Sequence, residues 1–363
     1  MPKSDRLTPL IPQRPENEKV WMVRSSAGYY LPHFKAAGIV AIGHLDVFNF
    51  ANPSSTLAKG ELDLEFVAGQ LETKYERPKG TVSSHISQIS QFCSDMNLGD
   101  IVVTVNSASV LVGRIAGFPY FDGSPVDLSN EDFQDDPLSY QLRRPVIWGP
   151  AISRATLPLP LERVFYSHRS VFEVTQYWDY IYHLLFPAFG YKNELHLSLR
   201  IRQQSDIRNV DIVALLSILQ DFEELAASMS GGEPPDSLTV QAGFFSKGDI
   251  WPKLSAKEKK RLLYLIVAGF LLCGGEIAPL EAWGLKVGPF KFKGAIGASA
   301  EAITEILKSA KEIMDKRNGN TAIENLQLDV PSIDADMIRT PPTKPTNKQT
   351  ILLVQTDGEQ TVS

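Results

Sequence analysis

Short apolar runs alternate with polar turns over the first half of the chain, which is the pattern of a small β-rich fold. Residues 20–24 (VWMVR) are a compact apolar run, and residues 39–43 (IVAIG) are a continuous apolar run typical of a strand buried on both faces. Between them, residues 29–38 (YYLPHFKAAG) can form a short helical turn that ends at Gly38.

Further short strands are predicted downstream. The runs 101–105 (IVVTV) and 110–121 (VLVGRIAGFPYF) are separated by a short Asn/Ser segment, which predicts a hairpin. Residues 143–148 (RRPVIW) and 171–175 (VFEVT) are two more β-rich runs. Several short strands with one or two helices between them predict a small mixed barrel.

Residues 81–96 (TVSSHISQISQFCSDM) predict a helix in this half. Its apolar side chains recur on one helical face, at Ile86, Ile89, Phe92 and Cys93. Either Ser83 or Ser84 would serve as the N-cap. A weaker helical pattern lies upstream, within residues 52–80.

The second half has a different texture, with longer helices. Residues 194–202 (ELHLSLRIR) and 236–245 (DSLTVQAGFF) predict strands. A strong helix is predicted over 209–229, capped by Asn209 or Asp211 and stopped by Gly231-Gly232. Two further helices are predicted, over 255–273 and 297–319.

These changes in composition and hydrophobic periodicity predict an α+β fold class and a chain of four parts. Residues 1–19 are expected to be a flexible arm, and residues 20–180 the barrel domain. Residues 187–317 are expected to form a separate α+β domain, and residues 318–363 a disordered tail rich in Thr, Pro and Asn. One short apolar patch in this tail, 351–354 (ILLV), could add a strand to the sheet edge of a partner.

The charge balance limits the partners of the first half. The chain of 363 residues carries a formal net charge of −6, and residues 20–186 alone hold 12 Lys/Arg against 17 Asp/Glu. This acidic balance argues against a broad surface that holds long DNA or RNA through phosphates. A local arginine cluster could still bind one or two phosphates.

Cysteine usage and the first residues bear on compartment and metal chemistry. The only two cysteines, Cys93 and Cys273, lie far apart and give neither a disulfide framework nor a zinc spacing. The first residues are polar and Pro-bearing, without the apolar segment of a secretory signal. We therefore expect a cytoplasmic protein with no metal site and no cofactor.

Aromatic, cationic and imidazole side chains stand at the ends of the first two predicted strands. Trp21 and Arg24 lie on the first strand, and His44 follows the second. One interpretation is a pocket that stacks on a flat ring and hydrogen-bonds to it. The other is ordinary core and rim, with Trp21 in the core, His44 in a loop, and Arg24 paired with Asp46 or with a carboxylate of residues 61–65.

Seven segments in one order carry a family resemblance. They are WMVRSSAGYYLPHF, GIVAIGHLD, SHISQISQF, NLGDIVVT, VLVGRIAG, and LRRPVIWG followed by ISRATLPL. In this order residues 20–175 resemble the EVE-like, PUA-superfamily recognition domain at the N-terminus of Mrr-type modification-dependent restriction enzymes. The resemblance covers less than half of the chain.

This resemblance implies a PUA/EVE-like barrel whose pocket takes a flipped, often modified, base. An extruded base loses its stacking, so such a pocket supplies aromatic or guanidinium planes and hydrogen-bonding groups at the ring edge. The implied ligand-binding residues are Trp21, Arg24, His44, Ser87, Gln88 and Trp148, and the implied phosphate contacts are Arg143 and Arg144.

The chain departs from the family pattern at two of these positions. Family members usually have Trp after Ile-Gly, where this chain has His44, and often Gly-Gln where it has Ser87-Gln88. A nucleotide-like small molecule or a degenerate pocket is therefore an alternative to a modified base. Simpler alternatives are a solvated strand start for Arg143 and Arg144, and first-turn helix polarity for Ser87 and Gln88.

Catalytic motifs are weak, so no catalytic residue is assigned. A restriction nuclease of this kind needs an Asp followed by Glu-x-Lys to hold a metal and orient water. The segment closest to this motif has Glu281 and Lys286 five residues apart, and the apolar strand expected before such a pair is missing from the sequence. No P-loop, GxSxG, HExxH or kinase signature occurs in the sequence.

The sequence thus predicts a binding or sensor protein for a nucleobase or nucleotide, in a bacterial defence or nucleic-acid surveillance context. The alternatives are a divergent restriction nuclease and a sensor coupled to a membrane-associated effector. The apolar run Leu262–Cys273 is short for a membrane span and favours a buried helix. Self-association, or a protein partner at the C-terminal domain or tail, is also expected.

Overall fold

The protein is described by a computed structural model, and its chain divides into two compact units. The structure describes residues 12–48, 62–128, 136–167, 169–186, 188–192, 194–203, 206–230, 239–242, 249–255, 285–287, 290–292 and 300–329. The N-terminal unit comprises residues 18–180. The C-terminal unit comprises residues 181–329 together with residues 12–17.

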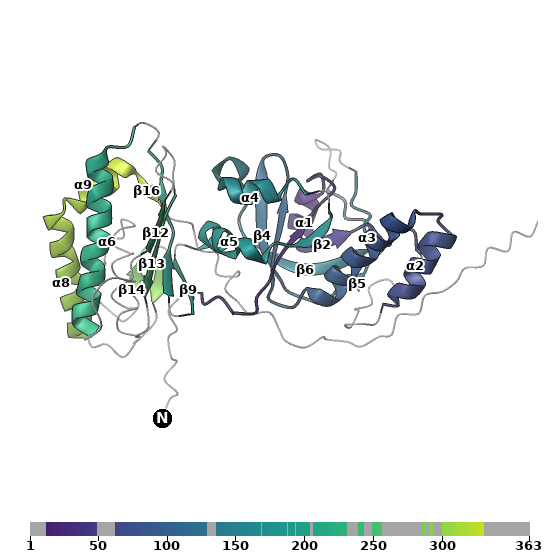
Figure 1. Cartoon of the computed structure of the whole chain (residues 1–363), viewed down its shortest axis with the longest axis horizontal. Coiled ribbons are helices and arrows are strands. Elements are labelled where there is room, and N and C mark those ends of the chain that lie inside the picture. The colour runs from purple at the N-terminus through teal and green to yellow at the C-terminus, as the bar shows by residue number, and fades with distance from the viewer. Residues whose placement is uncertain are drawn as a thin grey trace, which may run out of the picture. The chain divides into compact units, whose positions relative to one another are not determined.

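A curled, half-barrel sheet forms the N-terminal unit, so the fold is mixed α+β (Figure 1). Its main strands lie in the order β2-β6-β4-β3-β1-β8. They are β1 (Val20–Val23), β2 (Ile39–Ile42), β3 (Ile101–Val105), β4 (Ser109–Ile115), β6 (Leu142–Trp148) and β8 (Val171–Glu173). Two short strands, β5 (Tyr120–Phe121) and β7 (Ile152–Ser153), pair with β6 and β4. Strands β1 and β3 are parallel, and the other pairs are antiparallel.

The sheet curls far enough for β1 to contact β2, although three strands separate them in the sheet order. Both strands are buried at every position, which agrees with their continuous apolar sequence. The enclosed core takes Trp21 and Val23 from β1 and Val40 and Ile42 from β2. Because the two strands share one core, the residues that follow them can come close together.

Helices flank this sheet and add to its core. They are α1 (Leu31–Ala37), α2 (Leu64–Thr73), α3 (Lys79–Ser90), a π-helical turn (Gln91–Asp95) and α4 (Leu159–Val164), with 3-10 turns at Arg154–Thr156 and Thr175–Tyr177. Helix α3 begins at Lys79 rather than near Ser83 or Ser84, because the carbonyl of Pro78 accepts the first amide hydrogen bonds. Ile89 and Phe92, on the predicted apolar face, are buried in the core.

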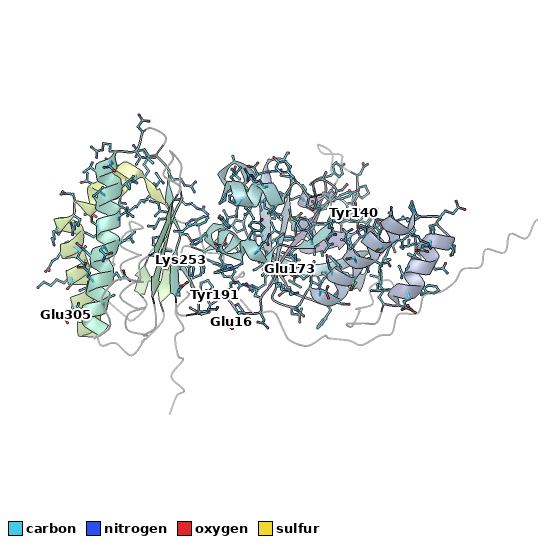
Figure 2. All side chains as sticks on the ribbon, in the orientation of Figure 1. Glu16, Tyr140, Glu173, Tyr191, Lys253 and Glu305 are labelled. Carbon is cyan, nitrogen blue, oxygen red and sulfur yellow. The ribbon has the colours of Figure 1, made fainter. Side chains whose placement is uncertain are left out.

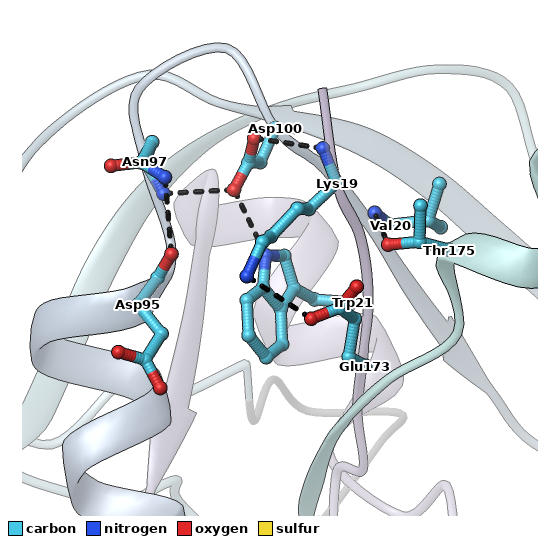
Figure 3. Close-up of polar contacts among 8 residues, drawn as sticks. All are labelled: Lys19, Val20, Trp21, Asp95, Asn97, Asp100, Glu173 and Thr175. Atoms are coloured by element: carbon cyan, nitrogen blue, oxygen red, sulfur yellow. Dashed lines mark hydrogen bonds and ion pairs between the residues drawn. The ribbon is translucent and has the colours of Figure 1, made fainter. Parts of the chain in front are cut away.

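A buried carboxylate, Asp100, joins the strands at one end of the sheet (Figure 3). It accepts hydrogen bonds from the indole Nε1 of Trp21 at 2.9 Å and from the backbone amides of Lys19 at 3.1 Å and Asn97 at 2.9 Å. The Lys19 ammonium lies 5.3 Å from the centre of the Trp21 ring and 3.1 Å from the Glu173 carboxylate. Asp100 therefore fixes the indole inside the protein.

A second sheet forms the C-terminal unit, in the order β16-β11-β13-β10-β9, with β12 paired to β13. The strands are β9 (Ala188–Tyr191), β10 (Glu194–Leu197), β11 (Leu199–Ile201), β12 (Thr239–Ala242), β13 (Asp249–Ser255) and β16 (Leu328–Asp329). Strands β14 (Leu285–Val287) and β15 (Phe290–Phe292) form a separate two-stranded pair.

Helices α6 (Asn209–Ser230) and α8 (Ala300–Lys316) run side by side on one face of this sheet (Figure 1). Leu215 and Phe222 of α6 pack in one cluster with Leu199 of β11 and Ile250 of β13. Helix α5 (Trp178–Leu185) contains the boundary between the two units.

The expected flexible arm and disordered tail are wrong for the parts that the structure describes. Gln13 forms a parallel bridge with Gly190, and the amide of Arg14 donates to the Gly190 carbonyl at 2.9 Å. At the other end, α9 (Gly319–Leu326) packs against α6, and β16 pairs with β11. Backbone pairing with a distant strand orders both segments despite their polar composition.

Three sequence-based hypotheses fall on residues outside the described ranges, and one of them is the partner-binding strand over 351–354. The apolar run Leu262–Cys273 and Glu281, of the nuclease hypothesis, both lie there, whereas Lys286 belongs to β14. Among the described residues, none of the helices combines the length and the apolar composition that crossing a membrane requires.

Replacement of Asp100 by alanine should destabilise the N-terminal unit. The change leaves three donors without their acceptor, two of them backbone amides, and should lower the free energy of unfolding by about 3 kcal/mol or more. Asp95→Ala is the matched control, because Asp95 is exposed and accepts from Asn97 only through its backbone carbonyl. That control should stay within about 0.5 kcal/mol of the wild type in urea unfolding. Equal losses in the two variants would contradict this role of Asp100.

Candidate functional site

A pocket of about 370 Å³ lies in the N-terminal unit, where several strands begin or end. Its lining residues come from four separate segments of the chain. They are Arg24, Ser26, Ala27, Ile42, Gly43, His44, Tyr140 and Ser170. Arg24 directly follows β1 and His44 closely follows β2, so the meeting of these two strands creates the pocket.

A left-handed turn after β1 forms one wall. Ser26, Ala27 and Gly28 all have positive φ, at 51°, 54° and 98°. Side-chain-bearing residues adopt this conformation at a cost of roughly 1–2 kcal/mol each. A Cβ atom on Gly28 would lie 2.4 Å from the Cα of Asn106, so the turn is seated directly on the β3–β4 connection. This close packing holds Ser26 and Ala27 at the pocket.

Another lining residue is Tyr140, which packs on Gly43 (Tyr140 is labelled in Figure 2). A Cβ atom on Gly43 would lie 2.6 Å from the Tyr140 ring, so glycine is required here for the ring to come this close. The Tyr140 ring also meets Tyr30 edge-on, with 5.3 Å between the ring centres. Beside Gly43, Asp46 accepts from the Gln141 amide at 3.0 Å, and burial raises the pKa of the Asp46 carboxyl.

Arg24 brings a guanidinium group to the pocket. Its backbone amide donates to the Ser170 carbonyl at 2.8 Å, and its Nη1 donates to the Ser167 carbonyl. Within the described ranges Arg24 forms no ion pair, so the alternative in which Asp46 is its partner does not agree with the structure.

His44 is one of two stacked imidazoles. Its ring lies parallel to the His85 ring, with 4.3 Å between centres and 13° between planes. Arg77 Nη1 lies 3.0 Å from His85 Nδ1; since a guanidinium only donates, Nδ1 of His85 accepts. Burial, with a smaller contribution from His85, lowers the pKa of His44 to about 4. Burial and then Arg77 also lower the pKa of His85, so both rings are neutral at pH 7.

Gln88 supports the pocket from behind rather than lining it. Its side-chain oxygen accepts from the amides of Ser170 at 2.7 Å and Val171 at 3.0 Å, and its side-chain nitrogen donates to Ser84. Gln88 therefore fixes the position of Ser170, a lining residue. Its neighbour Ser87 is exposed on α3 and does not line the pocket.

The two tryptophans are core residues. Trp21 is only 1% exposed and is bonded to Asp100, so the core alternative describes it better than a ligand platform does. Trp148 donates from its indole Nε1 to the carbonyl oxygens of Phe34 at 2.9 Å and Ile39 at 3.3 Å, and packs against the core. Neither side chain lines the pocket.

The expectation that Arg143 and Arg144 contact phosphate does not agree with the structure. Arg143 is buried, pairs with Asp122 at 3.0 Å and donates to the Tyr140 carbonyl at 2.8 Å. Arg144, 1% exposed, donates to the carbonyls of Phe92 at 2.8 Å and Met96 at 2.9 Å, where the π-helical turn ends. Burial lowers the pKa of Arg144 to about 10, so it remains charged at neutral pH. Both guanidinium groups hold the fold together.

Several lining residues are not indicated by any sequence pattern. Tyr140 lies in a segment without periodicity, and Ser170 lies in the approach to a short strand. The available signals were local: small residues after β1, which permit a tight turn, and Gly43, which permits close approach of a ring.

The C-terminal unit holds a Ser–His pair that has no access to solvent. Ser198 Oγ lies 2.8 Å from His183 Nδ1 and donates to the Phe186 carbonyl at 2.6 Å. Both residues are buried, and the His183 ring stacks on Trp251 with 4.3 Å between centres. Burial lowers the pKa of His183 well below its usual value. This arrangement is a packing feature of the core.

Within the described residues, no group of three or more His, Cys, Asp or Glu side chains is placed to hold a metal ion. Comparison with protein-family models, with curated proteins and with solved structures gives no match for this chain. Any functional conclusion therefore depends on the geometry of the pocket.

The lowered pKa of His44 predicts a loss of stability in acid. Since the pKa is about 4 in the folded chain against an ordinary 6.5, the unfolded state takes up the proton first as the pH falls. The associated stability is present above pH 6.5, is lost as the pH falls toward 4, and amounts to about 3 kcal/mol in full. The free energy of unfolding in urea should be measured at pH 7.5 and at pH 4.5. Between these two pH values, His44→Gln should lose about 2 kcal/mol less of this free energy than the wild type does. The same loss in both proteins would contradict a buried, neutral His44.

Proposed function

We propose that the N-terminal unit is a binding module for a nucleobase or nucleotide and that the pocket is its ligand site. The observation that carries this proposal is that Arg24 and His44, which follow different strands, line one pocket together with Tyr140. A volume of about 370 Å³ is within the range of small-molecule sites.

The lining suits a flat ring with polar edges. Tyr140 and His44 supply aromatic rings, and the buried Ile42 lies beneath them in the core. Arg24, Ser26 and Ser170 supply hydrogen-bonding groups around them. His44 contributes a neutral imidazole to this lining, with its Nε2 buried.

The finer fold assignment belongs to this proposal. The segments that carry the family resemblance occur in one order along the chain and lie in or beside a curled sheet. This arrangement supports a PUA/EVE-like barrel. On that basis we place the protein in nucleic-acid surveillance or defence, in the cytoplasm of a bacterial-type cell, as a sensor rather than an enzyme. The C-terminal unit would then report ligand capture through self-association or a partner protein. Fold-level analogy alone supports these wider roles.

The direct test is calorimetric titration of the full chain with plain and modified nucleosides. We expect binding of at least one nucleoside and a loss of about 10-fold or more in His44→Ala, since stacking on an aromatic ring contributes about 1–3 kcal/mol per base. Ser87→Ala is the control, because Ser87 is exposed on α3 and lies off the pocket. Thermal unfolding of each variant confirms that it is folded.

Two outcomes would count against the proposal. One is the absence of binding by every nucleoside and by every nucleoside 5′-monophosphate in the millimolar range. The other is binding that His44→Ala and Ser87→Ala weaken equally, which would place the ligand elsewhere on the protein.

A further inference from the structure

We infer that the pocket recognises an anionic group at Arg24 and that its ligand is a free nucleoside monophosphate rather than a base within a DNA duplex. This inference rests on the proposed function and specifies the ligand class for the same site. It assigns phosphate contact to Arg24 in place of Arg143 and Arg144.

The lining of the pocket carries one formal charge, and that charge is positive. Arg24 is cationic, His44 is neutral at pH 7, and no carboxylate is among the lining residues. The Asp46 carboxylate lies beside Gly43, since its Oδ2 would be 2.7 Å from a Cβ atom there, but it accepts from the Gln141 amide and is not part of the lining. A single cation in a partly enclosed site attracts an anion more strongly than the same cation on an open surface.

The guanidinium of Arg24 keeps donors free for a ligand. It has five N–H groups, and its one hydrogen bond within the described ranges is Nη1 to the Ser167 carbonyl. That bond anchors one edge of the group, while the pocket lining includes Arg24 itself. A planar guanidinium held in this way can donate two parallel hydrogen bonds to phosphate oxygens.

Further donors stand beside Arg24. Ser26 and Ser170, which carry hydroxyl groups, are among the lining residues. The backbone amides of Ser26 and Ala27 donate to no acceptor within the described ranges, although the next four amides of the same turn do. Within the described ranges, the turn that follows Arg24 therefore holds two backbone amides without a protein acceptor, and such amides suit phosphate oxygens.

The remainder of the N-terminal unit disfavours a long polyanion. Arg143 and Arg144 are buried, and their guanidinium groups donate hydrogen bonds to oxygen atoms of the protein itself. Residues 20–186 hold 12 Lys/Arg against 17 Asp/Glu. Duplex DNA binding draws its affinity largely from many phosphate contacts, which this balance does not supply. A pocket of about 370 Å³, near the lower end of small-molecule sites, also favours one phosphate over a longer chain.

The test is the ratio of affinities for a 5′-monophosphate and its parent nucleoside, measured by calorimetry on the full chain at low salt. We expect the monophosphate to bind at least 10-fold more tightly, with the advantage shrinking as sodium chloride is raised. Arg24→Gln should bring the ratio close to one. Arg169→Gln is the matched control, because Arg169 is exposed just before Ser170 and does not line the pocket, and it should keep the wild-type ratio.

The outcomes separate this inference from the proposed function. Equal binding of nucleoside and monophosphate, or an unchanged ratio in Arg24→Gln, overturns the anion site and leaves the base pocket standing. A short DNA duplex that contains the same base is the third ligand to compare. If this duplex binds more tightly than the free monophosphate, the inference of a free nucleotide is overturned. Failure of both nucleoside and monophosphate to bind overturns the proposed function itself.

Discussion

The contact between β1 and β2 is the constraint on which the pocket depends. In a flat sheet of the same order, three strands would separate them. The sheet instead curls around a core to which both strands contribute, and the residues that follow them meet. Arg24 and His44, twenty positions apart in sequence, thereby line the same hollow. The apolar character of the two strands thus decides where two polar side chains lie.

Buried polar groups make this arrangement specific. Asp100 fixes the indole of Trp21, Gln88 joins α3 to the approach of β8, and Arg144 caps the carbonyl end of the π-helical turn. Each satisfies several groups that burial would otherwise leave unpaired, so loss of any one is costly. Gln88 has a further consequence, since it holds Ser170 at the pocket. Trp21, Gln88 and Arg144, which the resemblance implies as ligand contacts, therefore stabilise the fold around the pocket and do not line it.

Local sequence was sufficient for much of the fold and for part of the site. Strands β1 to β4 and β6 were recognisable because buried strands consist of continuous runs of apolar residues. Helix α6 was recognisable from its helical periodicity and from the two glycines that follow it in the sequence. Strand-end positions also indicated Arg24 and His44. Sequence does not reveal which way a charged side chain on a strand points, so Arg143 and Arg144 looked solvated although both are buried. Tyr140, Gln13 and β16 take their roles from partners distant in sequence, which periodicity does not encode.

We propose that Arg24 and His44 act on one ligand in one pocket. Nuclear magnetic resonance of the full chain, labelled in its histidine and arginine side chains and titrated with a nucleoside monophosphate, tests it most directly. We expect the His44 ring and Arg24 Nε–H signals to shift together and to saturate at the same ligand concentration, while the signals of His196 and Arg144 do not shift. Shifts confined to other side chains, or movement of only one of the two, would contradict it.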